Sequence, residues 1–209
     1  MLVVAAASRD FWISRLERFH IDQAAARETV PRRHTRERRS MKFRQSARLH
    51  DPTLGLRLLS ILGQTGFSPR CFEIEITESA LVENIGIAQT VVDQLRQAGV
   101  RIALDDFGTG YATLSQLLSF RLDKIKIDRC FVSRLDKSED SKVIVRAIIG
   151  LAKGFGLTTT AEGVEDAGQL TYLKANGCTE GQGHLFSKAI PAADIPALLN
   201  RLPYDSAAA

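Results

Sequence analysis

Acidic side chains follow a short apolar run near the middle of this 209-residue chain. Asp105 and Asp106 stand side by side directly after Val100–Leu104, a β-branched and apolar run that is typical of a buried strand. Two adjacent carboxylates raise each other's pKa, and a divalent cation removes that penalty. An isolated Asp-Asp pair is most simply a solvated turn, so the ends of the other predicted strands decide between a turn and a metal site.

Polar residues also stand at the ends of the other predicted strands. They are Glu75 and Glu78, Lys126 and Asp128, Glu162 and Glu165, and finally Gln182. Any one of them alone would be an ordinary surface or structural residue, but packing gives no reason for every strand to finish in this way. Because the carboxyl ends of parallel strands meet at one face of a barrel, these side chains are predicted to form a single site.

The composition of this predicted site indicates its chemistry. Carboxylates without histidine or cysteine provide hard oxygen ligands, which suit Mg²⁺ or Mn²⁺ rather than zinc or copper. Asp105, at the centre of the set, could bridge two such ions, and a pair of metal ions favours displacement of an alkoxide at phosphorus. Lys126 would then orient the attacking water or neutralise the phosphoryl oxygens. The alternative for Lys126 is a structural ion pair that fills the mouth of a barrel.

Alternating strands and helices must position these residues. Strands are predicted at 72–77, 100–104, 123–127, 157–161 and from Cys178. Helices are predicted from Asp51–Pro52 to Gly63 or Gly66, and at 85–98, 112–119, 143–155, 168–175 and 193–200. This alternation predicts parallel strands covered by helices, either as an open doubly wound sheet or as a (β/α)₈ barrel. The barrel is favoured because no GxGxxG motif follows the first strand and polar residues end many strands. Only about six strand–helix units follow Met41, against the eight of a complete barrel.

The composition places the chain among ordinary globular proteins, with 44% hydrophobic and 25% charged residues. Three cysteines lie far apart in the sequence, so neither a disulfide framework nor a zinc site is expected, and a cytoplasmic location is predicted. No apolar run approaches the length of a membrane span, and the first residues lack a signal-peptide pattern. Neither secretion nor membrane insertion is therefore expected.

Basic residues are concentrated near the N-terminus. Between Arg27 and Arg48 there are eight arginines and one lysine against two glutamates, a local charge of +7, so the overall charge of +4 leaves −3 for the rest. The segment lacks interleaved aromatic residues, which favours a non-specific basic tail over a nucleic-acid arm. Residues 9–20 are predicted to form a short amphipathic helix, and residues 27–40 to be extended or disordered.

Five motifs together resemble one known family. They are Glu75-Ile-Thr-Glu-Ser79, Asp105-Asp-Phe-Gly-Thr-Gly110, Lys126-Ile-Asp128, Ala161-Glu-Gly-Val-Glu165 and Gly181-Gln-Gly183. From about Asp51 to Pro191 the chain resembles the EAL-domain family of cyclic-di-GMP phosphodiesterases. The resemblance implies a TIM-type (β/α) barrel that cleaves one phosphodiester of cyclic di-GMP to give linear pGpG, using Mg²⁺ or Mn²⁺.

The resemblance also implies a role for each matching residue. The implied metal ligands are Glu75, Asp105, Asp106 and Glu162, the last of which is also a candidate base. Lys126 and Gln182 would act as catalytic supports around the water and the phosphate. Glu78 would hold the loop Phe107–Tyr111, which the family uses both at the metals and at its dimer contact. A homodimer or another protein contact is therefore expected through residues 107–120.

The N-terminal part departs from the family pattern. The Glu-Ala-Leu-type motif, whose Glu binds metal, is absent from residues 1–40, and neither Phe43 nor Arg44 is the Asn expected at the next strand end. Losing one carboxylate and one amide removes most of one ion's ligands, so metal is expected to bind weakly or not at all. The prediction is a barrel that is incomplete at the N-terminus, its first units missing or replaced. Residues 1–40 would be an Arg-rich extension, 41–204 a partial EAL-type barrel and 205–209 a tail.

Three functions remain open from the sequence. The domain could hydrolyse cyclic di-GMP with impaired activity, bind cyclic di-GMP or a protein partner without turnover, or be a remnant without function. The missing Glu and Asn favour the second or third over hydrolysis, because removing supporting groups from a metal site costs orders of magnitude in rate. The sequence does not identify the parent protein or its sensory input.

Overall fold

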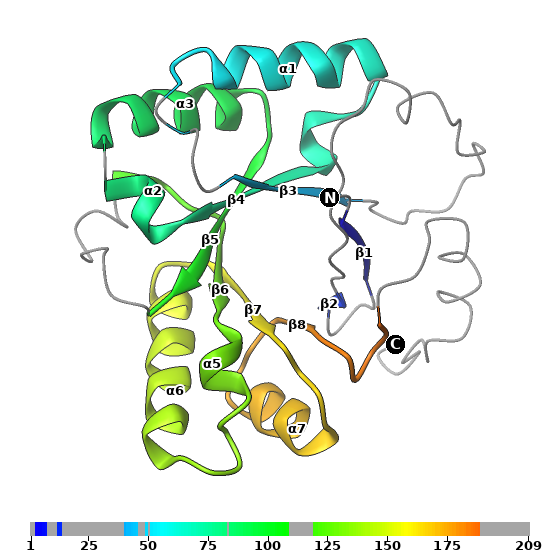
Figure 1. The fold of residues 1–209 in the computed structure, drawn as a ribbon, viewed down its shortest axis with the longest axis vertical. Helices are drawn as coiled ribbons and strands as arrows, with labels where there is room; N and C mark the ends of the chain where they lie inside the picture. Colours follow the sequence, from blue (N-terminus) through cyan, green and yellow to red (C-terminus); the bar gives the residue numbers. More distant parts are fainter. Residues whose placement is uncertain are drawn as a thin grey trace.

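A closed barrel of eight strands is the centre of the fold in the computed structural model (Figure 1). The structure describes residues 3–7, 12–13, 40–45, 49, 51–82, 84–108 and 119–188, the first three ranges as backbone only. The strands are β1 (Val3–Ala7), β2 (Trp12–Ile13), β3 (Ser40–Gln45), β4 (Phe72–Thr77), β5 (Arg101–Phe107), β6 (Lys124–Ile127), β7 (Thr158–Glu162) and β8 (Glu180–Gln182). Their order around the ring is β1-β2-β8-β7-β6-β5-β4-β3.

Most of the ring is parallel. Strands β3 to β8 each pair with the next in parallel, and β2 pairs with β8 in parallel. Strand β1 runs antiparallel to both β2 and β3 and closes the ring. The predicted TIM-type barrel is therefore confirmed, and the short strands β1 and β2 complete its ring before β3. The predicted helix over residues 9–20 is wrong at Trp12–Ile13, which form a strand, and its other residues lie outside the described ranges.

Helices cover the outside of this barrel (Figure 1). They are α1 (Leu54–Thr65), α2 (Glu78–Val82), α3 (Ile85–Gln97), α5 (Arg129–Val132), α6 (Glu139–Gly154) and α7 (Ala167–Ala175), with a 3₁₀ turn at Pro69–Cys71. Helices α1 and α3 pack on each other near β4 and β5, and α6 packs against β6 and β7. The predicted helices 112–119 and 193–200 fall almost entirely outside the described residues. None of the described helices is long and apolar enough to cross a membrane.

Local sequence explains where the main helices begin and end. The Ser138 and Asp166 side chains accept hydrogen bonds from backbone N–H groups in the first turns of α6 and α7, at 3.2 and 2.8 Å. Glu139 and Asp140 add negative charge to the N-terminal turn of α6, where the helix dipole favours it. Gly66 ends α1 in the left-handed conformation, with φ of 67°.

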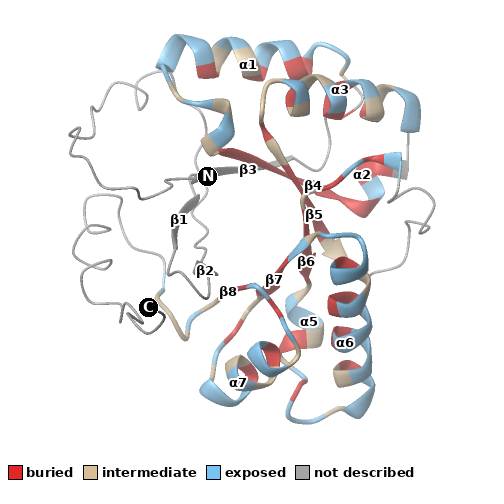
Figure 2. Cartoon of the chain, turned by 180° about the vertical axis from the view of Figure 1, so that it is seen from behind, coloured by how far each residue is buried: buried red, intermediate tan, exposed pale blue. Residues whose placement is uncertain are grey.

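The apolar core lies between the barrel and its helices. Along β4, Ile74 and Ile76 alternate with Glu73 and Glu75, and all four are fully buried. Since successive strand residues face opposite sides, the isoleucines face the helices and the glutamates face the inside of the barrel. Figure 2 shows buried residues along the strands and the inner faces of the helices, with exposed residues outside. This barrel is thus lined by charged groups where many TIM barrels carry branched apolar residues.

Candidate functional site

Lys126 on β6 is the centre of a buried ion cluster at the carboxyl ends of the strands. Its Nζ lies 2.9 Å from Glu75 Oε2, 2.8 Å from Asp105 Oδ1 and 2.5 Å from Glu162 Oε1. The side chains of Lys126, Glu75 and Asp105 are 1% exposed or less, and Glu162 is 14% exposed. The structure thus brings together four of the predicted site residues, from β4, β5, β6 and β7. We call these four residues the upper cluster.

Parallel register places these groups on one side of the sheet. Thr77 on β4 is level with Asp105 on β5, and Glu162 on β7 is level with Gln182 on β8. Residues in register on neighbouring strands project to the same face, so buried Gln182 adds its amide beside Glu162. The backbone oxygen of Gln182 also accepts a hydrogen bond of 3.0 Å from the N–H of Val164, which joins the loops after β7 and β8.

The charges in the upper cluster depend on one another. Burial alone would lower the pKa of Lys126, but the carboxylates of Glu75, Glu162 and Asp105 raise it, so the ammonium stays charged. Burial raises the pKa of Glu162, and the negative charge of Asp105 adds to that effect while Lys126 opposes it. With all groups ionised, three carboxylates and one ammonium carry a net charge of −2, which one divalent cation would balance.

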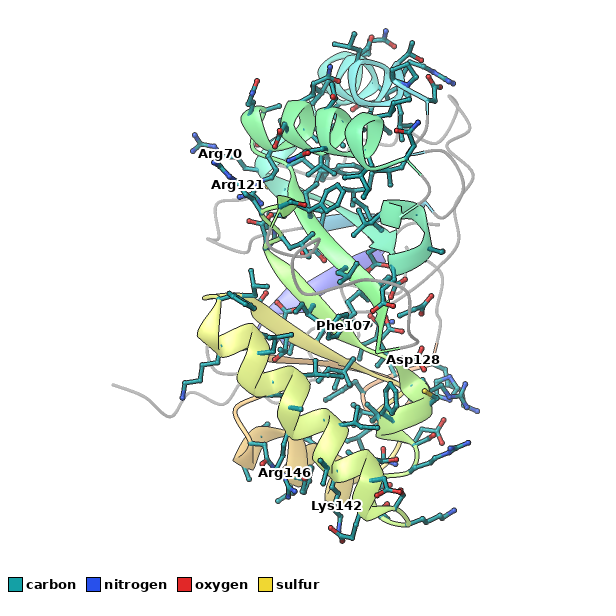
Figure 3. The ribbon with its side chains drawn as sticks, turned by 90° about the vertical axis from the view of Figure 1, so that its left-hand side faces the viewer. Arg70, Phe107, Arg121, Asp128, Lys142 and Arg146 are labelled. Atoms are coloured by element: carbon teal, nitrogen blue, oxygen red, sulfur yellow. The ribbon has the colours of Figure 1, made fainter. Side chains whose placement is uncertain are left out.

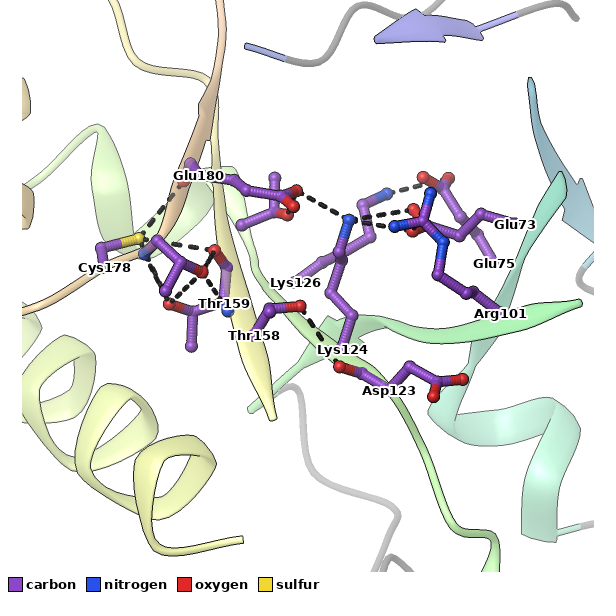
Figure 4. A network of polar contacts seen from close by, with 12 residues as sticks. Glu73, Glu75, Arg101, Asp123, Lys124, Lys126, Thr158, Thr159, Cys178 and Glu180 are labelled. Carbon is purple, nitrogen blue, oxygen red and sulfur yellow. Dashed lines mark hydrogen bonds and ion pairs between the residues drawn. The ribbon is translucent and has the colours of Figure 1, made fainter. Parts of the chain in front are cut away.

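A second ion cluster lies below the first, toward the amino ends of the strands (Figure 4). Lys124 Nζ lies 2.9 Å from Glu73 Oε2 and 2.7 Å from Glu180 Oε2, and Thr160 donates a 2.7 Å hydrogen bond to Glu180. Arg101 lies 3.7 Å from Glu73. Two cations and two carboxylates make this lower cluster neutral, so it has no charge for a metal to balance. We take the lower cluster to be Lys124, Glu73, Glu180 and Arg101.

The sequence prediction did not include the lower cluster, although a signal was present. Lys124, Glu73 and Glu180 each stand two residues before a predicted site residue, namely Lys126, Glu75 and Gln182. A period of two puts such pairs on the same face of a strand, so charged residues at both positions indicate a polar barrel interior.

Asp106 and Glu78 lie at the rim of the upper cluster. Asp106 has φ of 56°, a left-handed conformation that is uncommon for a residue other than glycine and that frequently marks functional sites. Partial burial opposes ionisation of Asp128, but hydrogen bonds from Cys130 and the nearby Asp106 lower the pKa of Asp128. Glu78 Oε1 accepts a 3.1 Å hydrogen bond from the N–H of Gly108 and so ties α2 to the end of β5.

The donor chemistry of the upper cluster fits a hard divalent cation, because its ligands would all be carboxylate oxygens. In this structure the carboxylates of the upper cluster form ion pairs with Lys126. Within the described part of the chain, no three His, Cys, Asp or Glu side chains are placed to hold a metal ion. Lys126 therefore competes with a cation for these carboxylates.

A mainly parallel closed barrel with carboxylates and one lysine at its strand ends defines a TIM-type barrel with an acidic site. A family model described as the EAL domain matches residues 2–189, and the chain belongs to this family. The predicted resemblance is therefore confirmed. The match includes residues 2–40, which the sequence prediction set apart as an extension.

Named relatives are similar to parts of this chain. Cyclic di-GMP phosphodiesterase PdeR from Escherichia coli is 44% identical over 144 residues, which cover 69% of this chain and 22% of PdeR. The EAL domain of DcpA from Mycobacterium smegmatis superposes with a TM-score of 0.72 and 38% identity, covering 77% of this chain and 73% of that structure. A manganese and cyclic-di-GMP complex of BlrP1 from Klebsiella pneumoniae gives a TM-score of 0.64 and 32% identity, covering 70% and 38%. The chain spans about a fifth of the length of the curated relatives it matches.

Proposed function

We propose that this chain is an EAL-type domain that binds cyclic di-GMP at the carboxyl ends of its strands and hydrolyses it to linear pGpG at a strongly reduced rate. The observation that carries the proposal is the upper cluster, in which three carboxylates from three strands converge on Lys126. The names of PdeR and of the BlrP1 complex support cyclic di-GMP as the ligand.

One Mg²⁺ or Mn²⁺ ion is the metal that this site would take. The residues that would hold it are Glu75, Asp105, Asp106 and Glu162. When bound, such an ion polarises a phosphoryl oxygen and activates water. Binding is weak because the ion must displace Lys126 from its carboxylates.

The side chains of this chain have separate tasks in hydrolysis. Glu162, whose pKa is raised by burial, accepts a proton from the attacking water more readily than an ordinary glutamate. Lys126 places its positive charge beside the phosphoryl oxygens. Gln182, level with Glu162, orients the water through its amide. Glu78 holds the chain after β5 through Gly108.

The N-terminal strands account for the reduced rate. In β3, Arg44 is in register with Glu75, near the position at which the family resemblance predicts an Asn. The glutamate of the family's naming motif is also absent. A metal site without two of its supporting groups loses orders of magnitude in rate.

The alternative function is ligand binding without turnover. The observation that favours it is the ammonium of Lys126, which neutralises part of the carboxylate charge and holds the cluster together in the absence of metal. Such a domain would act as a cyclic-di-GMP sensor or a protein-interaction module.

A single titration distinguishes the two functions. Purified protein is titrated with labelled cyclic di-GMP in excess Mn²⁺, and both bound ligand and pGpG are followed. Slow pGpG formation that Lys126→Met and Glu162→Gln abolish would support the proposal, and binding without product would support the alternative. Turnover at the rate of an intact EAL enzyme would contradict the reduced activity, and no binding would contradict both functions.

Two further parts of the prediction remain proposals. Residues 107–120, of which 107–108 and 119–120 are described, are proposed to form a homodimer or partner contact. The division into an Arg-rich segment 1–40, a barrel 41–204 and a tail 205–209 remains a prediction from composition, although strands β1 and β2 of the first segment belong to the ring; nucleic-acid binding is disfavoured.

A further inference from the structure

Arg129 stands at the rim of the candidate site. It is the first residue of α5, directly after Asp128, whose side chain caps that helix by accepting a 2.7 Å hydrogen bond from the N–H of Cys130. Its guanidinium lies 3.3 Å from Glu165 Oε1, in the loop after β7. The two side chains are 67% and 47% exposed, so solvent and ligands reach both.

Gly163 provides the surface on which Arg129 rests. Gly163 has φ of 68° and follows Glu162 of the upper cluster. A Cβ at Gly163 would overlap Cγ of Arg129, so the arginine stem crosses this glycine at close range. The stem is thereby held beside the residue that follows Glu162.

The charges around the carboxyl ends of the strands indicate what Arg129 could bind. The strand ends carry many carboxylates, and a cyclic dinucleotide carries two phosphodiester anions. Within three residues after the carboxyl ends of β4 to β8, in the part of the chain that the structure describes, Arg129 is the one exposed lysine or arginine. Lys126 is buried and already surrounded by carboxylates.

We propose that Arg129 binds a phosphate of the cyclic dinucleotide and exchanges Glu165 for that phosphate when the ligand arrives. This inference rests on the proposed function, because it assumes a phosphodiester ligand at the strand ends. An exposed arginine–glutamate pair contributes little to stability, so separating it is inexpensive. The planar guanidinium offers two parallel donors to phosphate oxygens, which is a stronger, charge-assisted contact. Glu165 thus holds Arg129 at the rim and competes with the ligand for it.

A purely structural ion pair makes a different prediction. If the pair only fastened the loops after β6 and β7, removing either partner would lower thermal stability and ligand affinity by similar amounts. If Arg129 binds phosphate, removing Arg129 weakens binding, whereas removing the competing charge of Glu165 leaves binding unchanged or strengthens it.

The test compares Arg129→Gln, Glu165→Gln and a control, Arg146→Gln. Arg146 is exposed on α6, and Figure 3 shows it on the outer helix layer, away from Asp128 at the end of β6. Binding of labelled cyclic di-GMP in Mn²⁺ is measured at low and high salt, with thermal melting of each variant. We expect Arg129→Gln to weaken binding about tenfold and to reduce its salt dependence. Arg146→Gln should match the wild type, and Glu165→Gln should bind at least as tightly as the wild type.

The outcomes separate this inference from the proposed function. If the wild type binds cyclic di-GMP and Arg129→Gln binds it with the same affinity, the role of Arg129 is overturned but the proposed function is not. Equal losses in Arg129→Gln and Glu165→Gln, with equal falls in melting temperature, would show a structural pair. Absence of binding by the wild type would overturn the proposed function and this inference with it.

Discussion

Replacing Lys126 with methionine tests the electrostatic account of the site most directly. Methionine preserves much of the volume of the lysine stem and removes the ammonium that three carboxylates surround at 2.5–2.9 Å. Glu75 and Asp105 are almost completely buried, so their negative charges would lose their closest cation inside the barrel. The variant should therefore fold less stably when no metal is present.

The size of this effect follows from the burial of the cluster. Removing one partner of a buried ion pair costs about 3–5 kcal/mol, because the remaining charge is left uncompensated. Without Lys126 the upper cluster changes from −2 to −3, which increases both the instability of the metal-free protein and its attraction for a divalent cation. Lys124→Met is the matched control, because it leaves the lower cluster at only −1.

The assay is urea unfolding at neutral pH with EDTA or with excess Mn²⁺. In EDTA both lysine variants should unfold at lower urea than the wild type. Excess Mn²⁺ should restore Lys126→Met toward the wild-type midpoint, while Lys124→Met should gain much less. A Lys126→Met midpoint equal to that of the wild type in EDTA would refute the role of this ammonium as the counter-ion of the cluster. Equal rescue of both variants would refute the assignment of the metal to the upper cluster.

Three further predictions concern the supports of the site. Gly183→Ala should lower the free energy of unfolding in urea by about 1–3 kcal/mol, because the added Cβ would overlap the backbone of Val164 in the loop after β7. The control Gly150→Ala, with open space around it in α6, should be neutral or stabilising, and equal losses in both would contradict the packing argument. Partial burial and a neighbouring carboxylate raise the pKa of Cys130 to about 11, so its alkylation rate should rise about tenfold per pH unit well beyond pH 9. The alkylation rate is measured by mass spectrometry, and a rate that levels off near pH 9 would show that Cys130 has the pKa of an ordinary thiol. Glu78→Gln should weaken the hydrogen bond to Gly108 and speed exchange of that amide, whereas unchanged exchange would show that Glu78 does not hold this segment.

Strand periodicity made most of the barrel predictable. The alternation over residues 72–77 matches β4, and the predicted helix 85–98 differs from α3 by one residue. Strand β5 was predicted to end at Leu104 but continues to Phe107, because Asp105 extends the alternation and faces a polar interior. Helix α6 begins four residues before the predicted Val143, since its first turn is set by a polar cap rather than by apolar periodicity.

Closure of the barrel was beyond sequence reasoning. The pairing of β2 with β8 joins Trp12 to Glu180, and no local pattern records a contact between residues so far apart in the chain. The convergence of Glu75, Asp105 and Lys126 was predictable because strand ends share one face of a barrel. The distances between these residues, and the ion pairs that Lys126 forms with the carboxylates, depend on how the whole ring packs. Sequence periodicity does not determine that packing.

The division of the apolar core has a consequence for how the chain assembles. The fully buried residues of one cluster lie within 49–122 and those of the other within 125–178, and the partly buried Phe107 and Leu157 pack against both clusters. Each half is contiguous in sequence, so the first can collapse while the second is still being synthesised. The lysines of β6 pair with the glutamates of β4, so these ion pairs join the two halves across the barrel interior, beside the backbone pairing of β5 with β6. Because β2 must await β8, the ring cannot close until nearly the whole barrel has been synthesised.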